Sequence, residues 1–317
     1  MKNALKTILI CMLLLSLTLP VLAQEVPTLT QEQIDEINAA LEDPEKELPV
    51  NEAYRVTVDP NDLSVAEGLD ADWMNILLLG TDTGSIKLNY GRTDAMIVAS
   101  VNVKTGEVKL MSLVRDMWID DIPLLHWKNR INTANAFGGP LLAIKTVNEV
   151  LGLNIERYIS VNFRGFRDAI DSLGGVTVTL SGAEAHIVGI SGRDEPLHLN
   201  GEQALNYVRI RELDDNFGRN NRQRKLLNAL LISAKESPVD EVLAAVTQAF
   251  RSMDTNITMP EVVKLIPVIL KNKDDAAMLS LPKPGEYYGT MMDETMSVIV
   301  FDKEKTRQSA HDFIYGE

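Results

Sequence analysis

The stretch NILLLGTDTGSIKLNYGRTDAMIVASVNV, residues 75–103, contains an apolar run, a glycine-containing loop and a second apolar run. Its first part, residues 75–80, is short and bounded by glycine, which is typical of a buried strand. Residues 95–103 and 107–114 are two further strand patterns, joined by a tight turn at residues 104–106. This pair predicts a β-hairpin next to the first strand.

Downstream of this stretch, strand and helix patterns alternate. The expected elements are a helix within 132–151, a strand at 156–163, a helix around 166–173, a strand at 176–180, a largely helical region over 201–253, a helix at 262–270, closing strands within 278–289 and at 297–302, and a last helix. Such alternation favours an α/β domain whose helices cover both faces of a sheet. No internal repeat interrupts it, so we expect one domain over residues 75–317.

The N-terminal part of the chain differs in composition from the rest. Residues 1–23 carry two lysines before a continuous apolar run, which predicts a signal peptide or a short membrane anchor. The run would span ~24 Å as a helix, against ~30 Å for a bilayer core. Residues 24–74 are rich in Glu, Asp and Pro, and we expect an exposed linker or stalk there. The protein is therefore expected to be exported, either held at the extracellular face of the cytoplasmic membrane or secreted to the cell wall.

Composition excludes several classes of function. The 317 residues carry a net charge of −14, which argues against nucleic acid as a partner because phosphate backbones are bound by basic surfaces. The one cysteine, Cys11, lies within the apolar N-terminal run, so we expect neither disulfides nor cysteine catalysis in the mature chain. The four histidines show no metal-ligand spacing, and the sequence has no G-x-S-x-G or P-loop motif.

Asp82-Thr83-Gly84-Ser85 is the kind of tetrapeptide with which aspartic proteases present a catalytic carboxylate. Those enzymes need two carboxylates that share a proton, held by two matched loops. The nearest second candidate, residues 171–174, has one residue inserted and follows a helix pattern. A protease is therefore disfavoured, and Asp82 is available for another chemistry.

Hairpin geometry brings four charged residues to one edge of the expected sheet. Asp82 follows the first strand, Arg92 and Asp94 open the second, and Arg115 ends the third. Since antiparallel neighbours place the end of one strand beside the start of the next, these side chains are expected to meet. Two carboxylates suit a hard cation such as Mg²⁺ and two guanidiniums suit an oxyanion, so the set favours a phosphate ester. Ordinary surface ion pairs are the alternative for each pair taken alone.

A second basic cluster lies further along the chain. Arg209 and Arg211 alternate as in an extended segment, and Arg219, Arg222 and Gln223 are spaced i, i+3 and i+4 near the start of a helix. Arginine binds phosphate through two nitrogens, and a helix N-terminus adds backbone donors. A solvated helix paired with nearby acids is the alternative. Two anion-binding clusters in an acidic chain favour a pyrophosphate bound with Mg²⁺.

The chain resembles the LytR-CpsA-Psr family in these charged motifs and in the segments around them. The similarity is carried, in collinear order, by NILLLGTD (75–82), GRTDAMIVASVN (91–102), MSLVRD (111–116), YISVNFRGFRDAIDSLGGVTV (158–178), LNGEQALNYVRIR (199–211) and FGRNNRQRKLL (217–227). It implies a three-layer α/β/α sandwich with a mixed central sheet, and a catalytic domain over residues 75–317 with the family motifs within 75–231.

The resemblance also implies an activity and roles for the residues. It implies a phosphotransferase at the outer face of the cytoplasmic membrane, moving a glycopolymer from a polyprenyl-pyrophosphate carrier to a peptidoglycan sugar hydroxyl as a phosphodiester. Polyprenyl phosphate is the implied second product. The implied roles are Asp82 and Asp94 as Mg²⁺ ligands, Arg92 and Arg115 as pyrophosphate contacts in catalysis, and Arg209, Arg211, Arg219 and Gln223 as the rest of a phosphate clamp, with Arg222 as an additional member.

A polyprenyl tail needs a long apolar slot. The candidate walls are the leucine-rich helices at 141–151, 226–232 and 262–270, with ordinary core packing as the alternative. Val114 stands where the family usually has proline, which makes the placement of Arg115 less secure. A polyprenyl-pyrophosphate pyrophosphatase and a non-catalytic polyprenyl-phosphate binder are the alternative functions, and the two carboxylates favour catalysis over simple binding.

Overall fold

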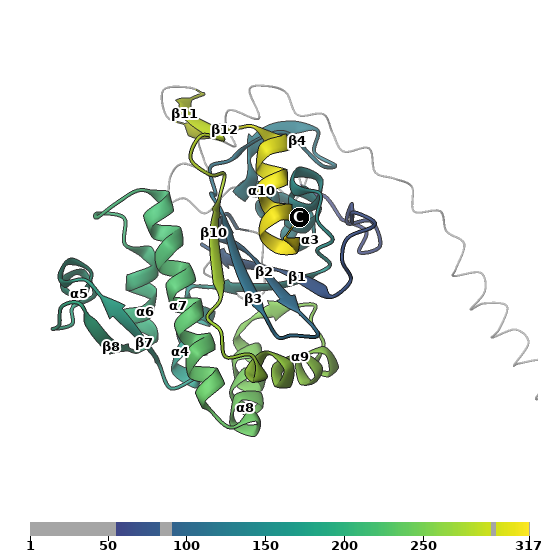
Figure 1. Cartoon of the computed structure of the whole chain (residues 1–317). Helices are drawn as coiled ribbons and strands as arrows, with labels where there is room; N and C mark the ends of the chain where they lie inside the picture. The colour runs from purple at the N-terminus through teal and green to yellow at the C-terminus, as the bar shows by residue number, and fades with distance from the viewer. Residues whose placement is uncertain (1–54, 83–90, 293–295, 317) are drawn as a thin grey trace, which may run out of the picture.

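The computed structural model describes residues 55–82, 91–292 and 296–316, and a six-stranded sheet forms its centre (Figure 1). The strand order is β10–β3–β2–β1–β6–β9. The strands are β1 (Trp73–Thr81), β2 (Thr93–Asn102), β3 (Val108–Leu113), β6 (Arg157–Asn162), β9 (Asp254–Thr255) and β10 (Ala277–Leu281). Pairing is antiparallel between β1 and β2, β2 and β3, and β6 and β9, and parallel between β1 and β6 and between β3 and β10. The predicted hairpin and the mixed sheet are confirmed.

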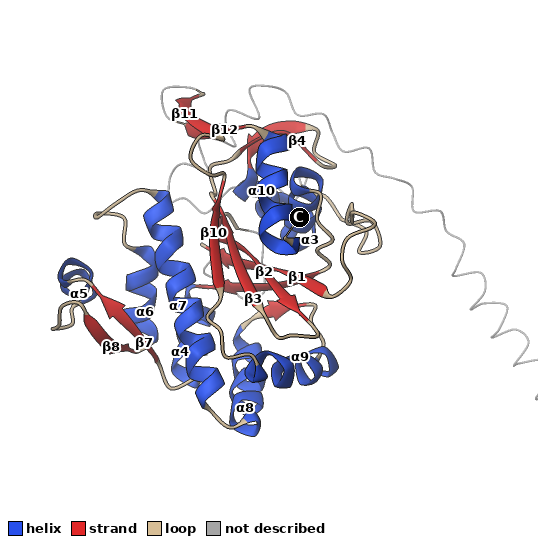
Figure 2. Ribbon diagram, in the orientation of Figure 1, coloured by secondary structure: helices blue, strands red, loops and turns tan. Residues whose placement is uncertain are grey.

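Alternate residues of the strands supply two different cores. On one face Leu77 and Leu79 pack with α3 (Ala134–Leu151) and α10 (Lys303–Tyr315). On the other face Ile76 packs with α8 (Val239–Ala249) and α9 (Met259–Lys271), while Ile97 packs with α9 and α7 (Asn216–Glu236). Since side chains of a strand alternate between its faces, both faces are apolar and both are covered. The three layers of the predicted α/β/α sandwich are visible in Figure 2.

A further core lies beside the sheet. It is built from α4 (Phe163–Ser172), β7 (Val176–Leu180), α5 (Gly182–Val188), β8 (Glu195–Leu199), α6 (Gly201–Arg209) and the start of α7. The helices α4, α6 and α7 agree with the predicted helical regions. The partner strand β8 and the short helix α5 were not predicted, because the segment between β7 and α6 is largely polar and shows no apolar period.

Two more hairpins lie at one end of the sheet (Figure 1). They are formed by β4 (Trp118–Ile122) with β5 (Trp127–Arg130), and by β11 (Tyr287–Met291) with β12 (Ser297–Phe301). The second pair agrees with the predicted closing strands. The first was not predicted, because its strands are short and the sequence WIDDI does not alternate.

The turn between β2 and β3 requires its glycine. Gly106 has a φ of +74°, in the left-handed region that glycine adopts without strain. A Cβ at this position would lie 2.2 Å from the carbonyl oxygen of Val268. The hairpin therefore packs its turn directly against the backbone of α9.

The linker predicted for residues 24–74 needs a correction in its described part. Residues 55–72 lie against the domain, with Val56, Val58 and Leu63 buried in the core that contains α3. Asn148 of α3 donates its side-chain amide to the carbonyl oxygen of Leu63 at 2.8 Å. Asp59, Asp62 and Glu67 of this segment are exposed while these three apolar residues are buried, and composition alone did not predict which residues would pack.

The predicted signal peptide or anchor at residues 1–23, with Cys11, and residues 24–54 of the predicted linker lie outside the described residues. Within the described part of the chain, none of the helices combines the length and the apolar character needed to cross a bilayer.

Candidate active site

Asp82 and Arg92 face each other where β1 ends and β2 begins. The backbone N–H of Asp82 donates to the carbonyl oxygen of Arg92 at 3.2 Å, next to an irregularity in the β1–β2 register. Arg92 Nε also lies 3.2 Å from Asp82 Oδ2, and both side chains are half-buried. The chain therefore returns to this edge of the sheet as the hairpin argument predicted.

Asp94 of β2 is bound by arginines from two distant parts of the chain. Its Oδ1 accepts a hydrogen bond from Nη1 of Arg115, which follows β3. Its Oδ2 lies 3.4 Å from Nη2 of Arg211, which follows α6 and is 117 positions away in sequence. The structure thus joins the two predicted charged clusters at a single carboxylate. Valine in place of the family's usual proline at 114 does not displace Arg115 from this position.

The two carboxylates have opposite electrostatic surroundings. Burial raises the pKa of Asp82; Arg92 opposes the rise and Asp94 adds to it, so the pKa lies above its ordinary value of 3.8. Burial also acts to raise the pKa of Asp94, but the guanidiniums of Arg115, Arg219 and Arg211 outweigh this and leave it below 3.8. Asp94 is therefore firmly anionic, whereas Arg92 does not outweigh the effect of burial on Asp82.

Arg219 is a buried cation whose guanidinium has no hydrogen-bond partner among the described residues. The residue is only 2% exposed, yet its Nε, Nη1 and Nη2 atoms form no hydrogen bond with other described groups. Burial, together with the neighbouring Arg115, lowers the pKa of its guanidinium to about 10. A buried arginine normally has its donors satisfied, because leaving them unpaired costs free energy. Its surroundings therefore suit an anionic ligand.

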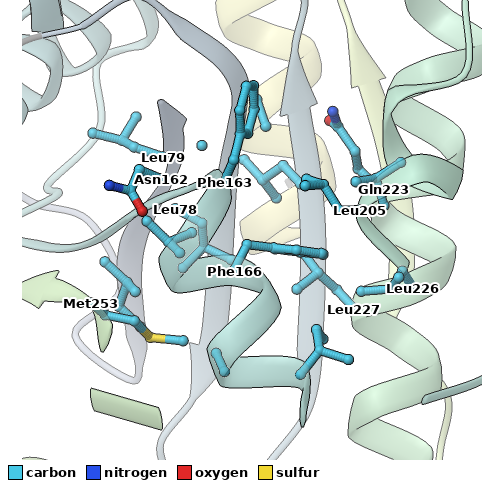
Figure 3. Close-up of a pocket in the computed structure, with 18 of the residues that line it drawn as sticks. Leu78, Leu79, Asn162, Phe163, Phe166, Leu205, Gln223, Leu226, Leu227 and Met253 are labelled. Carbon is cyan, nitrogen blue, oxygen red and sulfur yellow. The ribbon is translucent and has the colours of Figure 1, made fainter. Parts of the chain in front are cut away.

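A cavity of about 380 Å³ opens beside these residues, within the size range of small-molecule sites. One part of its lining is polar and consists of Asp94, Arg209, Arg211, Arg219, Asn162 and Gln223. The rest is almost entirely apolar, with side chains from the sheet, α4, α6, α7, α8 and Met253. Figure 3 shows Phe163 and Phe166 of α4 and Leu226 and Leu227 of α7 around the same space. The cavity therefore fits a ligand with a charged head and a long apolar body.

Arg209 lines the cavity, but its secondary structure differs from the prediction. The expected extended segment at Arg209 and Arg211 is wrong: Arg209 is the last residue of α6, and Arg211 follows it in a loop. Both nevertheless line the cavity. The Arg209 guanidinium lies over the ring of Phe163, with its central carbon 4.2 Å from the ring centroid. This contact fixes the position of the cation without neutralising its charge.

Arg222 does not lie at the cavity with the other residues predicted for the phosphate clamp, which corrects its predicted placement. Its guanidinium is bound by Asp214, with Oδ1 at 2.5 Å from Nη2 and Oδ2 at 2.8 Å from Nη1, and Glu184 lies 3.6 Å away. Nη2 also donates to the carbonyl oxygen of Ile210 at 2.8 Å. Since these groups bind its Nη1 and Nη2 atoms, Arg222 holds the loop between α6 and α7 in place. Gln223, the next residue, does line the cavity.

Only one of the three predicted apolar walls borders the cavity. The helix at 226–232 contributes Leu226, Leu227 and Leu230. The helix at 141–151 belongs to α3 and packs in the core on the opposite face of the sheet, and the helix at 262–270 packs in cores behind β1 and β2. The walls supplied by α4, α6 and α8 were not predicted, because an apolar helix pattern does not reveal which neighbour it faces.

Asp116 and its partners were also missed as parts of the site. The Asp116 carboxylate accepts a hydrogen bond from Asn216 Nδ2 at 2.6 Å, and lies 3.4 Å from Arg130 Nη1 and 3.5 Å from Arg115 Nε. It therefore ties the end of β3 to β5 and to the first turn of α7. The adjacency of Asp116 to Arg115 was the one available signal in the sequence, since the β4–β5 hairpin that delivers Arg130 was not predicted.

The donor set of Asp82 and Asp94 fits a hard divalent cation that shares its coordination with a ligand. Among the described residues, no group of three His, Cys, Asp or Glu side chains lies close enough to hold a metal ion without help. Mg²⁺ is commonly bound by one or two carboxylates, with substrate phosphates and water as the other ligands. A cation between the two aspartates would also offset the burial and the repulsion that raise the pKa of Asp82.

Fold and site together define a class: an α/β/α protein with an apolar cavity that ends in a cluster of arginines and aspartates. Comparison with known proteins identifies the family. The LytR_cpsA_psr family model matches residues 29–312, and the chain belongs to this family. The recognition made from the motifs is therefore confirmed.

Curated relatives and solved structures agree with this placement. The chain is 35% identical to "Polyisoprenyl-teichoic acid--peptidoglycan teichoic acid transferase TagU" of Enterococcus faecalis over 60% of this chain and 64% of the relative. It is 33% identical to the protein of the same name from Bacillus cereus strain AH820 over 72% of this chain and 75% of the relative. The crystal structure of B. subtilis TagV has a TM-score of 0.65 and 27% identity, over 78% of this chain and 98% of that one. The chain spans just under two thirds of the E. faecalis relative's length.

Proposed function

We propose that the protein is a phosphotransferase that moves a glycopolymer from a polyprenyl-pyrophosphate carrier to a sugar hydroxyl of peptidoglycan. The observation that carries the proposal is the cavity, whose apolar body ends at Arg219, a cation with no hydrogen-bond partner among the described residues. A polyprenyl pyrophosphate has the same division into a long hydrocarbon and an anionic head. The names of the curated relatives, which are teichoic acid transferases, support the same activity and favour an anionic wall polymer as the transferred group.

Different groups of residues bind the isoprenoid chain and the phosphates. The apolar walls from α4, α6, α7 and the sheet bind the isoprenoid chain. Arg209, Arg211, Arg219 and Gln223 bind the phosphates at the polar end of the cavity. Asp82 and Asp94 are the residues that would hold Mg²⁺, and the bound cation would neutralise charge on the pyrophosphate.

The reaction exchanges one phosphorus–oxygen bond for another. The acceptor hydroxyl attacks the phosphorus that carries the glycan; a new P–O bond forms, the hydroxyl loses its proton, and the bond to the bridging oxygen breaks. Polyprenyl phosphate leaves with the electron pair of that bond. Arg115 and Arg219 lie where they can stabilise the charge that develops on the phosphate oxygens. A simple binder of polyprenyl phosphate would not need the two half-buried carboxylates Asp82 and Asp94 at the phosphate end.

The proposal places the enzyme outside the cytoplasm, at the outer face of the cytoplasmic membrane. The lysines and the apolar run of residues 1–23 support export, and both proposed substrates are components of the cell envelope. The acidic charge of the chain argues against a role on nucleic acid.

A transfer assay tests the proposal. Purified protein with Mg²⁺, a polyprenyl-pyrophosphate-linked glycan and peptidoglycan should release polyprenyl phosphate and place the glycan on peptidoglycan. Arg209→Ala should lower the rate about 100-fold, because it removes one preorganised charge contact. The matched control is Arg193→Ala, whose side chain is 83% exposed, and it should retain the wild-type rate. Release of polyprenyl phosphate with the glycan recovered only in solution would show a pyrophosphatase instead.

A further inference from the structure

Helix α7 carries polar lining residues near its start and apolar lining residues further along. Its first turn contains Asn216 and Phe217, Arg219 and Gln223 line the polar part of the cavity, and Leu226 and Leu230 line the apolar part. At 1.5 Å per residue, Arg219 and Leu230 are about 16 Å apart along the helix axis. In terms of the proposed function, the isoprenoid extends towards the C-terminal end of α7 and the phosphates lie near its N-terminal end.

An aromatic pair lies beyond the phosphate end. Phe217 stacks on Tyr287 of β11, with ring centroids 5.2 Å apart and an angle of 25° between the planes. Both residues are half-buried, and Phe217 also packs against the core that contains α3, so neither residue is fully covered. Figure 1 shows the β11–β12 hairpin at the same end of the molecule as the start of α7. The Phe217–Tyr287 pair thus joins the hairpin to the helix that carries the phosphate-binding residues.

The hairpin is fixed to the site by backbone contacts as well. The N–H of Ile299 in β12 donates to the carbonyl oxygen of Asp116 at 2.9 Å, and Met117 and Ile299 form an isolated parallel bridge. The side chain of the same Asp116 binds Asn216 in the first turn of α7. Asp116 thus links β12 to the first turn of α7, and this link holds the aromatic pair in a set position relative to Arg115 and Arg219.

The chemistry assigns this position to the acceptor. In phosphoryl transfer the attacking and leaving oxygens lie roughly in line on opposite sides of the phosphorus. The leaving oxygen belongs to polyprenyl phosphate, which extends along α7 towards Leu230. The attacking hydroxyl must then approach from the opposite side, which is the side of Phe217 and Tyr287.

We propose that the Phe217–Tyr287 pair is a platform on which a sugar ring of the acceptor glycan rests, a role that depends on the proposed function. The apolar C–H face of a pyranose packs against aromatic rings, whose faces are electron-rich. Rigid aromatic side chains also lose little conformational entropy on binding. Met291 lies on the same side of β11 as Tyr287, is 53% exposed, and extends this surface by ~13 Å along the strand. An elongated, uncharged sugar chain fits such a surface.

Tyr288 supplies a matched control. It is 63% exposed and adjacent to Tyr287 on the same strand, so its side chain points to the opposite face of the hairpin. A general effect of removing an aromatic ring from the hairpin would appear in both variants. A platform on one face would appear only in the Tyr287 variant.

The test is a transfer assay with the full chain, saturating donor and increasing amounts of soluble peptidoglycan glycan strands. We expect Tyr287→Ala and Phe217→Leu to raise the acceptor KM about fivefold, the range expected for loss of an aromatic contact. The donor KM should stay at its wild-type value. Tyr287→Phe, which keeps the ring, and Tyr288→Ala should retain the wild-type acceptor KM. Thermal melting of each variant reports whether it is folded.

Two outcomes would overturn the platform. One is an unchanged acceptor KM in folded Tyr287→Ala and Phe217→Leu, and the other is an equal rise in Tyr288→Ala. A calorimetric titration with the same glycan strands needs no catalysis: the wild type should bind and Tyr287→Ala should bind more weakly. Absence of transfer by the wild type would reject the proposed function, whereas equal binding by the wild type and Tyr287→Ala would reject the platform alone.

Discussion

Arg219 and Arg222 lie three positions apart on α7 and are equally buried, at 2% and 3% exposure, yet they differ in their partners. Arg222 is bound by Asp214, Glu184 and a backbone carbonyl. Arg219 has no hydrogen-bond partner among the described residues. Arg222 therefore stabilises the fold, whereas Arg219 carries a cost in stability that a bound anion would offset.

This difference predicts opposite effects of the same substitution. Arg219→Met should raise the free energy of unfolding by about 1–2 kcal/mol, because it removes a buried cation that has no hydrogen-bond partner among the described residues. The same variant should lose about 100-fold in transfer rate, since a phosphate contact is gone. Chemical denaturation and the transfer assay measure the two effects.

The control at the neighbouring position is Arg222→Met. It leaves Asp214 and Glu184 without their cation and should lower the free energy of unfolding by about 2 kcal/mol, less than for a fully buried pair because Asp214 is 37% exposed. A loss of stability in Arg219→Met would show that this guanidinium has a structural role after all.

The two aspartates predict pH effects of opposite sign. The pKa of Asp82 is raised above 3.8, so the folded state binds its proton more readily than the unfolded state. Asp82→Asn should therefore be more stable than the wild type at pH 7, with the gain vanishing as the pH falls through the raised pKa to 3.8. The pKa of Asp94 is lowered, so its charge stabilises the fold above pH 3.8. Asp94→Asn should be less stable at pH 7, with the deficit shrinking as the pH falls below 3.8.

Urea unfolding of both variants and the wild type at pH 7, 5 and 3, without divalent cations, measures these differences. If both variants shift stability in the same direction at pH 7, the assignment of charge within the site is wrong.

At the scale of elements, α7 is the helix that joins the two chemical halves of the cavity. Gln223 and Arg219 lie on its polar part and Leu226, Leu227 and Leu230 on its apolar part. In Figure 3 Gln223 lies above Leu226 and Leu227 along the same helix. The separation predicts that the apolar part can be changed without altering phosphate binding.

Leu230→Trp should fill part of the apolar space. We expect about a tenfold rise in KM for a donor with a long isoprenoid chain, since about 1.4 kcal/mol of apolar burial corresponds to a factor of ten. A donor with a short chain should keep its wild-type KM. Ile232→Trp is the control, because Ile232 lies on the same helix, is 36% exposed and does not line the cavity. An equal effect of both variants, or an equal effect on both donors, would contradict the assigned wall.

Local pattern was enough to predict much of this arrangement. The β1–β2–β3 region followed from apolar runs and a tight turn, and its hairpin geometry placed Asp82, Arg92, Asp94 and Arg115 at one edge correctly. Pattern was not enough where the partner comes from a distant element. Arg219 and Arg222 are neighbours on one face of the helical pattern, and only the fold decides that Asp214 and Glu184 reach Arg222 and not Arg219.

The same limit explains the errors at larger scale. The leucines at 141–151 and 226–232 have similar patterns, but the first helix is surrounded by core on the far face of the sheet while the second borders a cavity. Hydrophobic period reports that one side of a helix is covered, and not whether protein or ligand covers it. Arg209 was assigned to an extended segment because a two-residue spacing of arginines is typical of one. The assignment was wrong because the same spacing also occurs where a helix ends.

At the scale of the whole molecule, the cavity lies between the sheet and the smaller core of α4 to α7. Its lining includes Leu79 and Ile97 from the sheet, and Ile170 and Leu205 from the smaller core. The position of every charged group in the site therefore depends on how these cores pack. Residues 55–72, which cover the core around α3, contribute to the same packing.

This segment is expected to be part of the stable unit. Val58→Ala should lower the free energy of unfolding by about 1–2 kcal/mol, because Val58 is 6% exposed and packs in the core. Val65→Ala is the control in the same segment, since Val65 is 41% exposed, and it should change stability by less than about 0.5 kcal/mol. If thermal melting shows equally small effects for Val58→Ala and Val65→Ala, residues 55–72 act as a linker and not as part of the stable unit.

The stripe of lining residues on α7 has a consequence for how such a site can vary. An inserted residue between Gln223 and Leu226 would rotate everything after it by about 100°, turning the leucines out of the cavity while the arginine stayed in place. The apolar and polar lining residues of α7 are thus held in a fixed relative orientation, because they lie on one continuous helix. Homologous chains can therefore vary at positions of α7 that do not line the cavity, whereas we expect insertions and deletions within this helix to be selected against.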